Sequence, residues 1–257
     1  MAQRSTQSQH FTLLHGACLS SWHWHRVVTQ MEADGYSCLA VDAPGRGDQA
    51  RQATHTSAMQ EYVASLEAQL DHLSEPTILV AHGASAIIAS QFIEQYADRV
   101  TAVVYLAGFV LRNGDSIAKV SNGITTSWAL NHMVYSDAGN DFEIERSKLR
   151  RSFCSDLSQQ GAEEMARHMT TEPTELLHTP LAISDQYYGS VPAFYIECTQ
   201  DNIIPIGIQR ISRFSREFND VYSVNASHMA MLSKPGEVCD ILQDIARQLE
   251  NPMQRAG

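Results

Sequence analysis

Residues 77–86, TILVAHGASA, join an apolar strand pattern to a tight turn of small residues, and the helical pattern IIASQFIEQYADRV follows at 87–100. A strand, a sharp turn and a helix in this order form the setting in which many enzymes mount a catalytic serine, with the pattern G-x-S-x-G. On that pattern Ala81 and Ser85 take the two glycine positions, and Gly83 takes the serine position. The stretch therefore predicts a nucleophile turn that carries no hydroxyl at its centre.

The rest of the chain predicts the sheet to which this turn belongs. Apolar strand patterns at 11–15, 37–42, 77–82, 101–108, 191–198 and 220–225 alternate with amphipathic segments. Strands separated by helices of 10–15 residues indicate a mostly parallel sheet with helices on both faces. We therefore expect a doubly wound α/β fold that forms a single domain over residues 1–257.

The interval 112–188 interrupts the alternation. It contains LRNGDS, NHMVYSDAGND and SQQGAEEMARHM, with helical but no convincing strand patterns. We interpret it as a helical lid inserted between two sheet strands, because lids over the strand ends commonly shape the pocket and exclude water. Ordinary connecting helices remain the alternative.

Composition and charge narrow the class of partner. The chain has 257 residues, 44% of them apolar and 18% charged, and a net charge of −11. Nucleic acid and anionic membranes require basic surface, so neither is expected as a partner. The polar N-terminus and the lack of any apolar run of about 18 residues favour a cytoplasmic protein. Whether the chain is a monomer or a homodimer stays open.

The cysteine and histidine spacings do not indicate a metal site. The five cysteines are odd in number and include no C-x-x-C pair, which favours free thiols in a reducing compartment. No cluster with zinc-ligand spacing occurs, since His23 and His25 on either side of Trp24 fall on different helix faces. We expect neither metal nor cofactor, and a small molecule as the substrate.

Polar or small residues follow four of the predicted strands. They are His15-Gly16-Ala17-Cys18, AHGASA at 81–86, Thr199-Gln200-Asp201 and Asn225-Ala226-Ser227-His228. In doubly wound sheets, ligands bind beyond the carboxyl ends of the strands, so these four segments should converge. The order turn, acid, histidine matches a catalytic triad, which is defined by the roles of its members rather than by their spacing.

LLHGACLSSWHWHRVV, LAVDAPGRG, the turn, YIECTQDNIIPIGIQR and NASHMAMLSKPGEV resemble the plant methylesterase and hydroxynitrile-lyase branch of the α/β-hydrolases and its bacterial relatives. The resemblance runs from Phe11 to about Leu249 and is weakest in the lid. It implies that His228 is the catalytic base and Asp201 its orienting carboxylate. It also implies that the backbone N–H groups of Ala17 and Ala84 form the oxyanion hole.

Three positions depart from this resemblance. Where lyases of the branch carry a threonine and a lysine, this chain has Gly16 and Met229, which argues against cyanohydrin cleavage. Gly83 in place of serine should keep the path of the turn while relieving its strain, because glycine reaches positive φ freely. Ser85 as a shifted nucleophile is disfavoured, since Ile87 would then occupy a position that requires a small residue.

An apolar pocket is expected around the base. The expected pocket set comprises Gly16, Cys18, Trp22, Phe109, Trp128, Met133 and Met229. About half of the large apolar residues near the base should line the pocket and the others should belong to the core; these residues are Trp22, Phe109, Trp128, Met133, Met229 and Met231.

The residues support three functions. The leading hypothesis is a serine-free enzyme in which His228 acts as general acid and base on a carbonyl or hydroxyl compound, as a lyase, isomerase, cyclase or cofactor-free oxygenase. The first alternative is a carboxylesterase or methylesterase whose serine is replaced by Gly83. The second is a non-catalytic small-molecule binder, since a hydrolase fold that loses a triad member can become a receptor. For the single residues, the alternative to a catalytic role is that His228 is a structural loop histidine and Asp201 a turn residue.

Overall fold

A single parallel sheet forms the centre of the molecule. The computed structural model describes residues 9–46, 58–121 and 133–250. Six strands pair in the order β2-β1-β3-β4-β8-β9, and every neighbouring pair is parallel. The strands are β1 (His10–Leu14), β2 (Ser37–Val41), β3 (Thr77–His82), β4 (Val100–Leu106), β8 (Ala193–Cys198) and β9 (Asp220–Val224). The predicted doubly wound α/β fold is confirmed.

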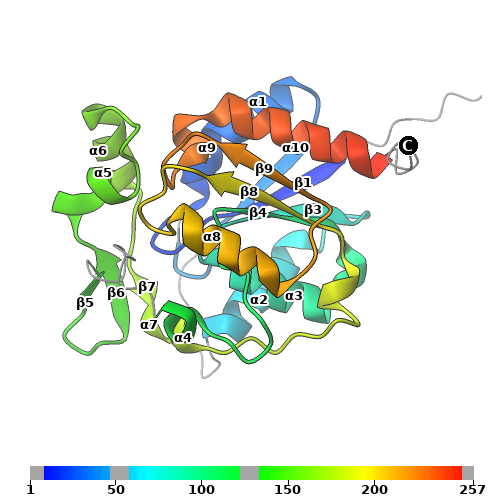
Figure 1. The fold of residues 1–257 in the computed structure, drawn as a ribbon, viewed down its shortest axis with the longest axis horizontal. Coiled ribbons are helices and arrows are strands. Elements are labelled where there is room, and N and C mark those ends of the chain that lie inside the picture. The colour runs from blue at the N-terminus through cyan, green and yellow to red at the C-terminus, as the bar shows by residue number, and fades with distance from the viewer. Residues whose placement is uncertain (1–8, 47–57, 122–132, 251–257) are drawn as a thin grey trace, which may run out of the picture.

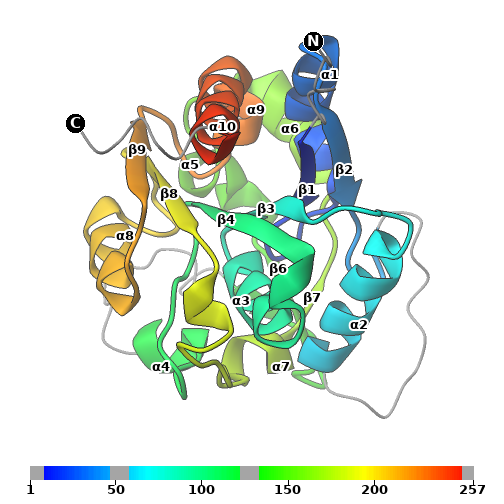
Figure 2. The same ribbon diagram turned by 90° about the vertical axis from the view of Figure 1, so that its right-hand side faces the viewer.

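Helices cover both faces of this sheet, as the apolar strands require. β3 and β8 are buried along their whole length. Figure 2 shows one layer of helices above the sheet and a second layer below it. The upper layer holds α1 (His25–Ala33), α9 (Ala230–Ser233) and α10 (Pro235–Glu250), and the lower holds α2 (Ala58–Leu70), α3 (Ser85–Gln95) and α8 (Ile206–Ser212).

The amphipathic pattern of α10 shows why a helix forms and packs there. Proline occupies its first position, where no backbone N–H is needed for a helical hydrogen bond. Val238, Leu242 and Ile245 recur at intervals of four and three residues, and all three are fully buried. The helix therefore places one apolar stripe against the sheet and against α1.

The register of the strands brings the candidate segments together. Leu14 pairs with Ala81, and Leu106 pairs with both His82 and Ile196. The strands β1, β3, β4 and β8 therefore end at the same edge of the sheet. From β1 the chain first winds outward to β2 and then returns to β3 on the other side of β1. Such a reversal in strand order marks the place where α/β sheets bind ligands.

The insertion between β4 and β8 is not purely helical, contrary to the sequence prediction. It contains a three-stranded antiparallel sheet in the order β5-β6-β7. Figure 1 shows this small sheet with α5 and α6 at one end of the molecule, the end toward which β8 and β9 point. Its elements are α4 (Ile117–Ser121), β5 (Met133–Tyr135), β6 (Asp141–Ile144), α5 (Leu149–Ser152), α6 (Gln159–Arg167), β7 (Glu172–Pro173) and α7 (Thr174–His178).

Short 3₁₀ turns complete the described elements. They are η1 (Ser21–Trp24), η2 (Ala97–Arg99), η4 (Arg146–Lys148), η5 (Tyr188–Ser190) and η6 (Arg213–Ser215). Among the described helices, none is long and apolar enough to cross a membrane. No group of three or more histidine, cysteine, aspartate or glutamate side chains in the described ranges could hold a metal ion.

Candidate active site

The turn after β3 adopts a left-handed conformation at Gly83. Its φ is +58°, which glycine reaches at no steric cost. The Gly83 N–H donates to the carbonyl oxygen of Leu106 at 3.1 Å, which fixes the turn to β4. A Cβ atom built on Gly83 would lie 3.1 Å from Nε2 of His228 and 3.4 Å from Cε1. Any side chain at this position would therefore point at the histidine ring.

His228 and Asp201 form a buried pair, although 27 residues separate them in sequence. The Nδ1 atom of His228 lies 2.7 Å from Oδ2 of Asp201. Both residues are only 4% exposed. A carboxylate can only accept a hydrogen bond, so Nδ1 of His228 carries a hydrogen atom and donates a hydrogen bond to Asp201. In neutral His228 the free lone pair is consequently on Nε2, which faces Gly83 and the cavity.

Backbone N–H groups and a buried glutamine hold Asp201. Its Oδ1 accepts the N–H groups of Ile203 at 2.7 Å and Ile204 at 2.9 Å. The amide of Gln209 donates to Oδ2 at 3.3 Å, and it also bonds the carbonyl oxygens of Cys198 and Ile204. Sequence reasoning missed Gln209. A glutamine among the apolar residues of the segment IGIQRIS in α8 is the weak sequence signal that could have found it.

Ala17 and Ala84 lie on the cavity that His228 also lines. They come from the loop after β1 and from the turn after β3, on two neighbouring strands of the sheet. No hydrogen bond among the described residues occupies the N–H of either alanine. Within the described part of the chain, both N–H groups therefore remain available to a ligand atom, which is the property that the donors of an oxyanion hole require.

The cavity is almost entirely apolar. Within the described residues no charged carboxylate, lysine or arginine lines it, and His228 supplies the imidazole that reaches it. Its walls come from the core loops and from the lid. The lining residues are Ala17, Cys18, Ala84, Phe109, Ile117, Met133, Phe142, Ile144, Phe153, Leu177, Ile203, Ile204 and His228. Cys18, Phe109 and Met133 of the expected pocket set are among them.

Three other members of the expected pocket set are not among the lining residues. Trp22 instead stacks on His168 of the lid, with ring centroids 3.9 Å apart. The Met229 side chain is fully buried in the core. Gly16 lies beneath the site, where a Cβ atom would come within 2.8 Å of Nδ1 of His82, so glycine is needed for close packing. Trp128 lies outside the described residues.

Two side chains near Gly83, those of Ser85 and Cys18, carry a hydroxyl or a thiol. The Ser85 hydroxyl is buried and lies 2.9 Å from the His82 carbonyl oxygen and 3.2 Å from that of Leu14. Burial, followed by the charge of Glu172, raises the pKa of the Cys18 thiol well above its ordinary value. Cys18 therefore remains a neutral thiol, which is a poor nucleophile.

His82 supports the base from below and was not singled out from the sequence. Its Nε2 donates to the carbonyl oxygen of His228 at 2.9 Å, and the two rings lie 4.4 Å apart. Burial, followed by repulsion from His228, lowers the pKa of His82 well below its ordinary value. His82 therefore acts as a neutral donor to the histidine loop.

The buried histidines predict that acid destabilises the fold. Burial lowers the pKa of His23 from 6.5 to about 3, and it also lowers the pKa of His15. The unfolded chain therefore binds protons below pH 6.5 that the folded chain excludes. The free energy of unfolding should have its highest value above pH 6.5. Below that pH it should fall as the pH decreases, by up to about 1.4 kcal/mol per pH unit for each such histidine.

Urea unfolding at pH 7.5 and 5.5 measures this dependence above the range in which ordinary carboxylates titrate. His23→Asn should reduce the loss of stability between the two pH values. His178→Asn is the matched control, because His178 is exposed on α7. An equal loss in the His23 variant and in the parent would contradict the assignment.

Known proteins share this architecture over nearly the whole chain. Residues 13–241 match the alpha/beta hydrolase family. Methylesterase 7 of Arabidopsis thaliana is 29% identical over 248 residues, covering 92% of this chain and 95% of that protein. Putative methylesterase 11, chloroplastic, of the same plant is 28% identical and is matched over 65% of its own length, with 94% of this chain covered.

A solved structure agrees with the fold described above. The crystal structure of polyneuridine aldehyde esterase has a TM-score of 0.83 at 23% identity, with 93% of this chain and 100% of that chain covered. In sequence, polyneuridine aldehyde esterase of Rauvolfia serpentina is 26% identical over 260 residues, covering 95% of this chain and 98% of that protein. With methylesterase-like relatives and this parallel sheet, the chain belongs to the alpha/beta hydrolase family.

Proposed function

We propose that this protein is a methylesterase-like enzyme that acts on the carbonyl group of a small, neutral, largely apolar molecule. In this proposal His228 is the general base and Asp201 holds its tautomer, while Gly83 stands where related enzymes carry their serine. One observation carries it: a Cβ atom on Gly83 would lie 3.1 Å from Nε2 of His228, yet glycine has no hydroxyl from which this nitrogen could take a proton.

The absence of a hydroxyl argues against a covalent acyl-enzyme. Loss of a triad serine costs about 10⁶ in kcat, and only about 10³–10⁴ over water remains from the oxyanion hole and binding. The nearby alternatives are also unfavourable, since Ser85 donates within the protein and the Cys18 thiol stays protonated. A reaction that relies on the base and the oxyanion donors alone is therefore favoured.

The proposed mechanism uses groups that the site already holds. Nε2 of His228 takes a proton from a water molecule or from a hydroxyl group of the substrate, bound in the space above Gly83. The resulting oxygen attacks the carbonyl carbon, and negative charge develops on the carbonyl oxygen. The N–H groups of Ala17 and Ala84 stabilise that charge in a cavity with few competing dipoles. Asp201 stabilises the imidazolium that forms. With an ester, the bond between the carbonyl carbon and the alcohol oxygen then breaks, and the imidazolium returns its proton to that oxygen, so that an alcohol leaves and the acid or acyl product remains.

The relatives favour an ester as the carbonyl compound. Methylesterases stand among the proteins that match nearly the whole chain, which supports an ester hydrolase over the lyase, isomerase, cyclase and oxygenase reactions. The apolar lining supports a neutral ester over its free acid, because no cation among the described residues faces the cavity to bind a carboxylate.

A second candidate is an esterase that has lost activity through replacement of its serine. The retained path of the turn favours it, since Gly83 keeps a φ of +58° and faces the base. On this view the chain binds an ester without turning it over. The substitution Gly83→Ser separates the two candidates.

A panel of neutral methyl and aryl esters, each paired with its free acid, tests the proposal. We expect a neutral ester to be turned over and its free acid to bind more weakly, as measured by product formation and by calorimetry. Turnover in H₂¹⁸O should place one labelled oxygen in the product acid if water attacks directly. Binding of esters without product would instead favour the inactive esterase, and preferred binding of the free acids would exclude the assigned substrate class.

A further inference from the structure

Two carboxylates of the lid contact the two loops that carry the candidate catalytic groups. Glu172 lies on β7 and reaches the loop after β1, which contains Ala17. Asp156 lies between α5 and α6 and reaches the loop after β9, which contains His228. The lid therefore meets both loops directly as well as lining the cavity.

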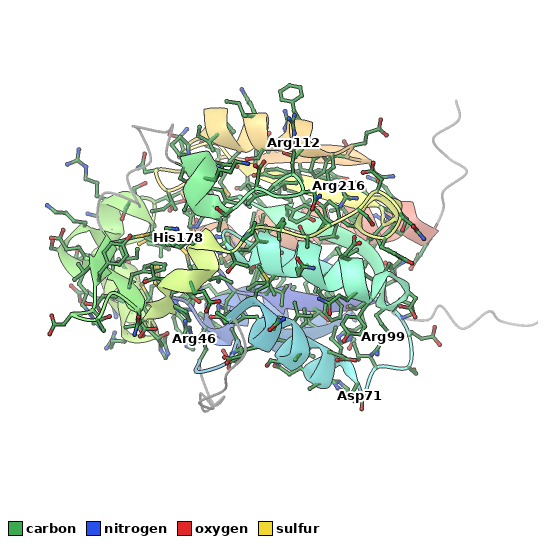
Figure 3. The ribbon with its side chains drawn as sticks, turned by 90° about the horizontal axis from the view of Figure 1, so that it is seen from below. Arg46, Asp71, Arg99, Arg112, His178 and Arg216 are labelled. Atoms are coloured by element: carbon green, nitrogen blue, oxygen red, sulfur yellow. The ribbon has the colours of Figure 1, made fainter. Side chains whose placement is uncertain are left out.

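Glu172 is one of the most buried charged side chains among the described residues. It is 1% exposed, and its Oε2 accepts the Cys18 N–H at 2.8 Å. Its charge is compensated by Arg46, whose Nη2 lies 3.1 Å from the same oxygen, while the hydroxyl of Tyr62 donates to Oε1. Arg46 lies near the lid end of the molecule (Figure 3). This ion pair thus links the lid, the Arg46 loop and α2 at one point.

The contact constrains the residue directly after Ala17. Cys18 has a φ of +62°, a conformation that non-glycine residues adopt only when their surroundings hold them there. Glu172 fixes its N–H, and the Thr170 N–H donates to its carbonyl oxygen at 3.0 Å. The Glu172 carboxylate and the Thr170 backbone thereby bind the N–H and the carbonyl oxygen of Cys18, which favours one orientation of the loop and of the Ala17 N–H.

Asp156 makes the matching contact on the other loop. Its Oδ2 accepts the Ser227 N–H at 3.0 Å, and its Oδ1 accepts the Ser227 hydroxyl. The carbonyl oxygen of Phe153, also in the lid, accepts the Met229 N–H at 3.1 Å. The residues on both sides of His228 are therefore bonded to one lid segment.

We propose that Glu172 and Asp156 are positioning residues. Through them the lid holds the Ala17 N–H and the His228 imidazole in the orientations that the site requires. Each acts through a backbone loop and touches no reacting atom. The effect on catalysis rests on the proposed function, whereas the effect on the conformational order of the two loops does not. The proposal can therefore be tested separately from any substrate.

Hydrogen–deuterium exchange of the full chain tests it directly. Asp156→Ala should speed exchange in peptides covering 224–230 by about tenfold or more, the factor expected for loss of a charge-assisted hydrogen bond, and leave peptides covering 16–20 unchanged. Glu172→Gln should do the reverse. Glu164→Gln is the matched control, an exposed lid carboxylate on α6 that should change neither loop.

Two results would overturn the proposal. One is unchanged exchange in both loops in both variants. The other is a uniform rise that includes β3 and β4, which would indicate general destabilisation. If Glu172→Gln fails to fold because Arg46 loses its partner, Tyr62→Phe removes one donor to Glu172 and keeps the ion pair. It should give a smaller rise confined to 16–20, and no rise there would also overturn the proposal.

Kinetics distinguish positioning from a purely structural role. With an ester found by the panel, Asp156→Ala should lower kcat at least tenfold while KM changes less than twofold, since the cavity lining is kept. A rise in KM at constant kcat would show that Asp156 shapes the pocket rather than the base. Should no ester be turned over, the proposed function fails, and the exchange data still decide the loop assignment.

Discussion

Replacing His228 with alanine should lower kcat, for an ester that the parent protein turns over, by about 10²–10⁴-fold, the usual contribution of a general base, with little change in KM. The reason is geometric, since Nε2 is the basic atom that faces the space above Gly83 and the cavity. The variant should fold, because Asp201 keeps three other donors, from Ile203, Ile204 and Gln209. Steady-state kinetics and urea unfolding measure the two effects.

His178→Ala is the control for this variant. His178 is exposed on α7 and is labelled near the lid end in Figure 3. It should leave kcat unchanged. Turnover that survives in His228→Ala would remove the assigned base, and ligand binding that is indifferent to the change, with no product in the parent, would favour a non-catalytic binder.

The central sheet was predictable because its signals are local. The inner strands β3, β4 and β8 are mostly apolar, and α10 shows a clear helical period. The pairing of His228 with Asp201 was also within reach, since loops after neighbouring parallel strands must meet at one edge. These features follow from short-range patterns together with one rule of topology.

The lid strands were missed because they carry too little pattern. β5 has three residues, and β7 has two and ends in a proline. An alternation of period two needs a run of about four residues or more to be recognised, and only β6, with four, reaches that minimum. Their pairing depends on the small sheet as a whole, which no single segment encodes. The expected helical lid was wrong in this respect.

The positioning contacts could not be read from the sequence at all. Glu172 bonds a backbone N–H that lies 154 residues earlier, and Asp156 bonds one 71 residues later. Neither carboxylate belongs to a recognisable motif. Trp22 illustrates the opposite error, because its position near the first loop suggested a pocket, whereas its ring stacks on His168 of the lid.

Gly83→Ser is the substitution that separates the proposed enzyme from an inactivated esterase. We expect the free energy of unfolding to fall by about 1–2 kcal/mol, because a side chain at positive φ is strained. A further loss should come from the new Cβ, 3.1 Å from Nε2 of His228, since the ring must give way by a few tenths of an ångström. Urea unfolding measures the total.

Comparison with Gly114→Ser isolates the contribution of the contact with His228. Gly114 has a φ of +78°, and a Cβ there meets nothing within 4 Å. This control shares the strain of the backbone and lacks the histidine. The difference between the two variants therefore reports the contact with His228. Equal losses would show that the imidazole moves aside freely, leaving room for a serine.

The activity of Gly83→Ser then decides the chemistry. If the site works without a nucleophile, the serine fills the space meant for water or a substrate hydroxyl, and kcat for the enzyme's ester should not rise. Phosphonate labelling at position 83, together with strong new hydrolysis of aryl esters, would instead show that a serine hydroxyl is all that the site lacks for esterase activity. His228, Asp201 and the backbone donors would then be those of an inactivated esterase. Only if kcat fails to rise does the Nε2 lone pair of His228 act as a base without a serine at position 83.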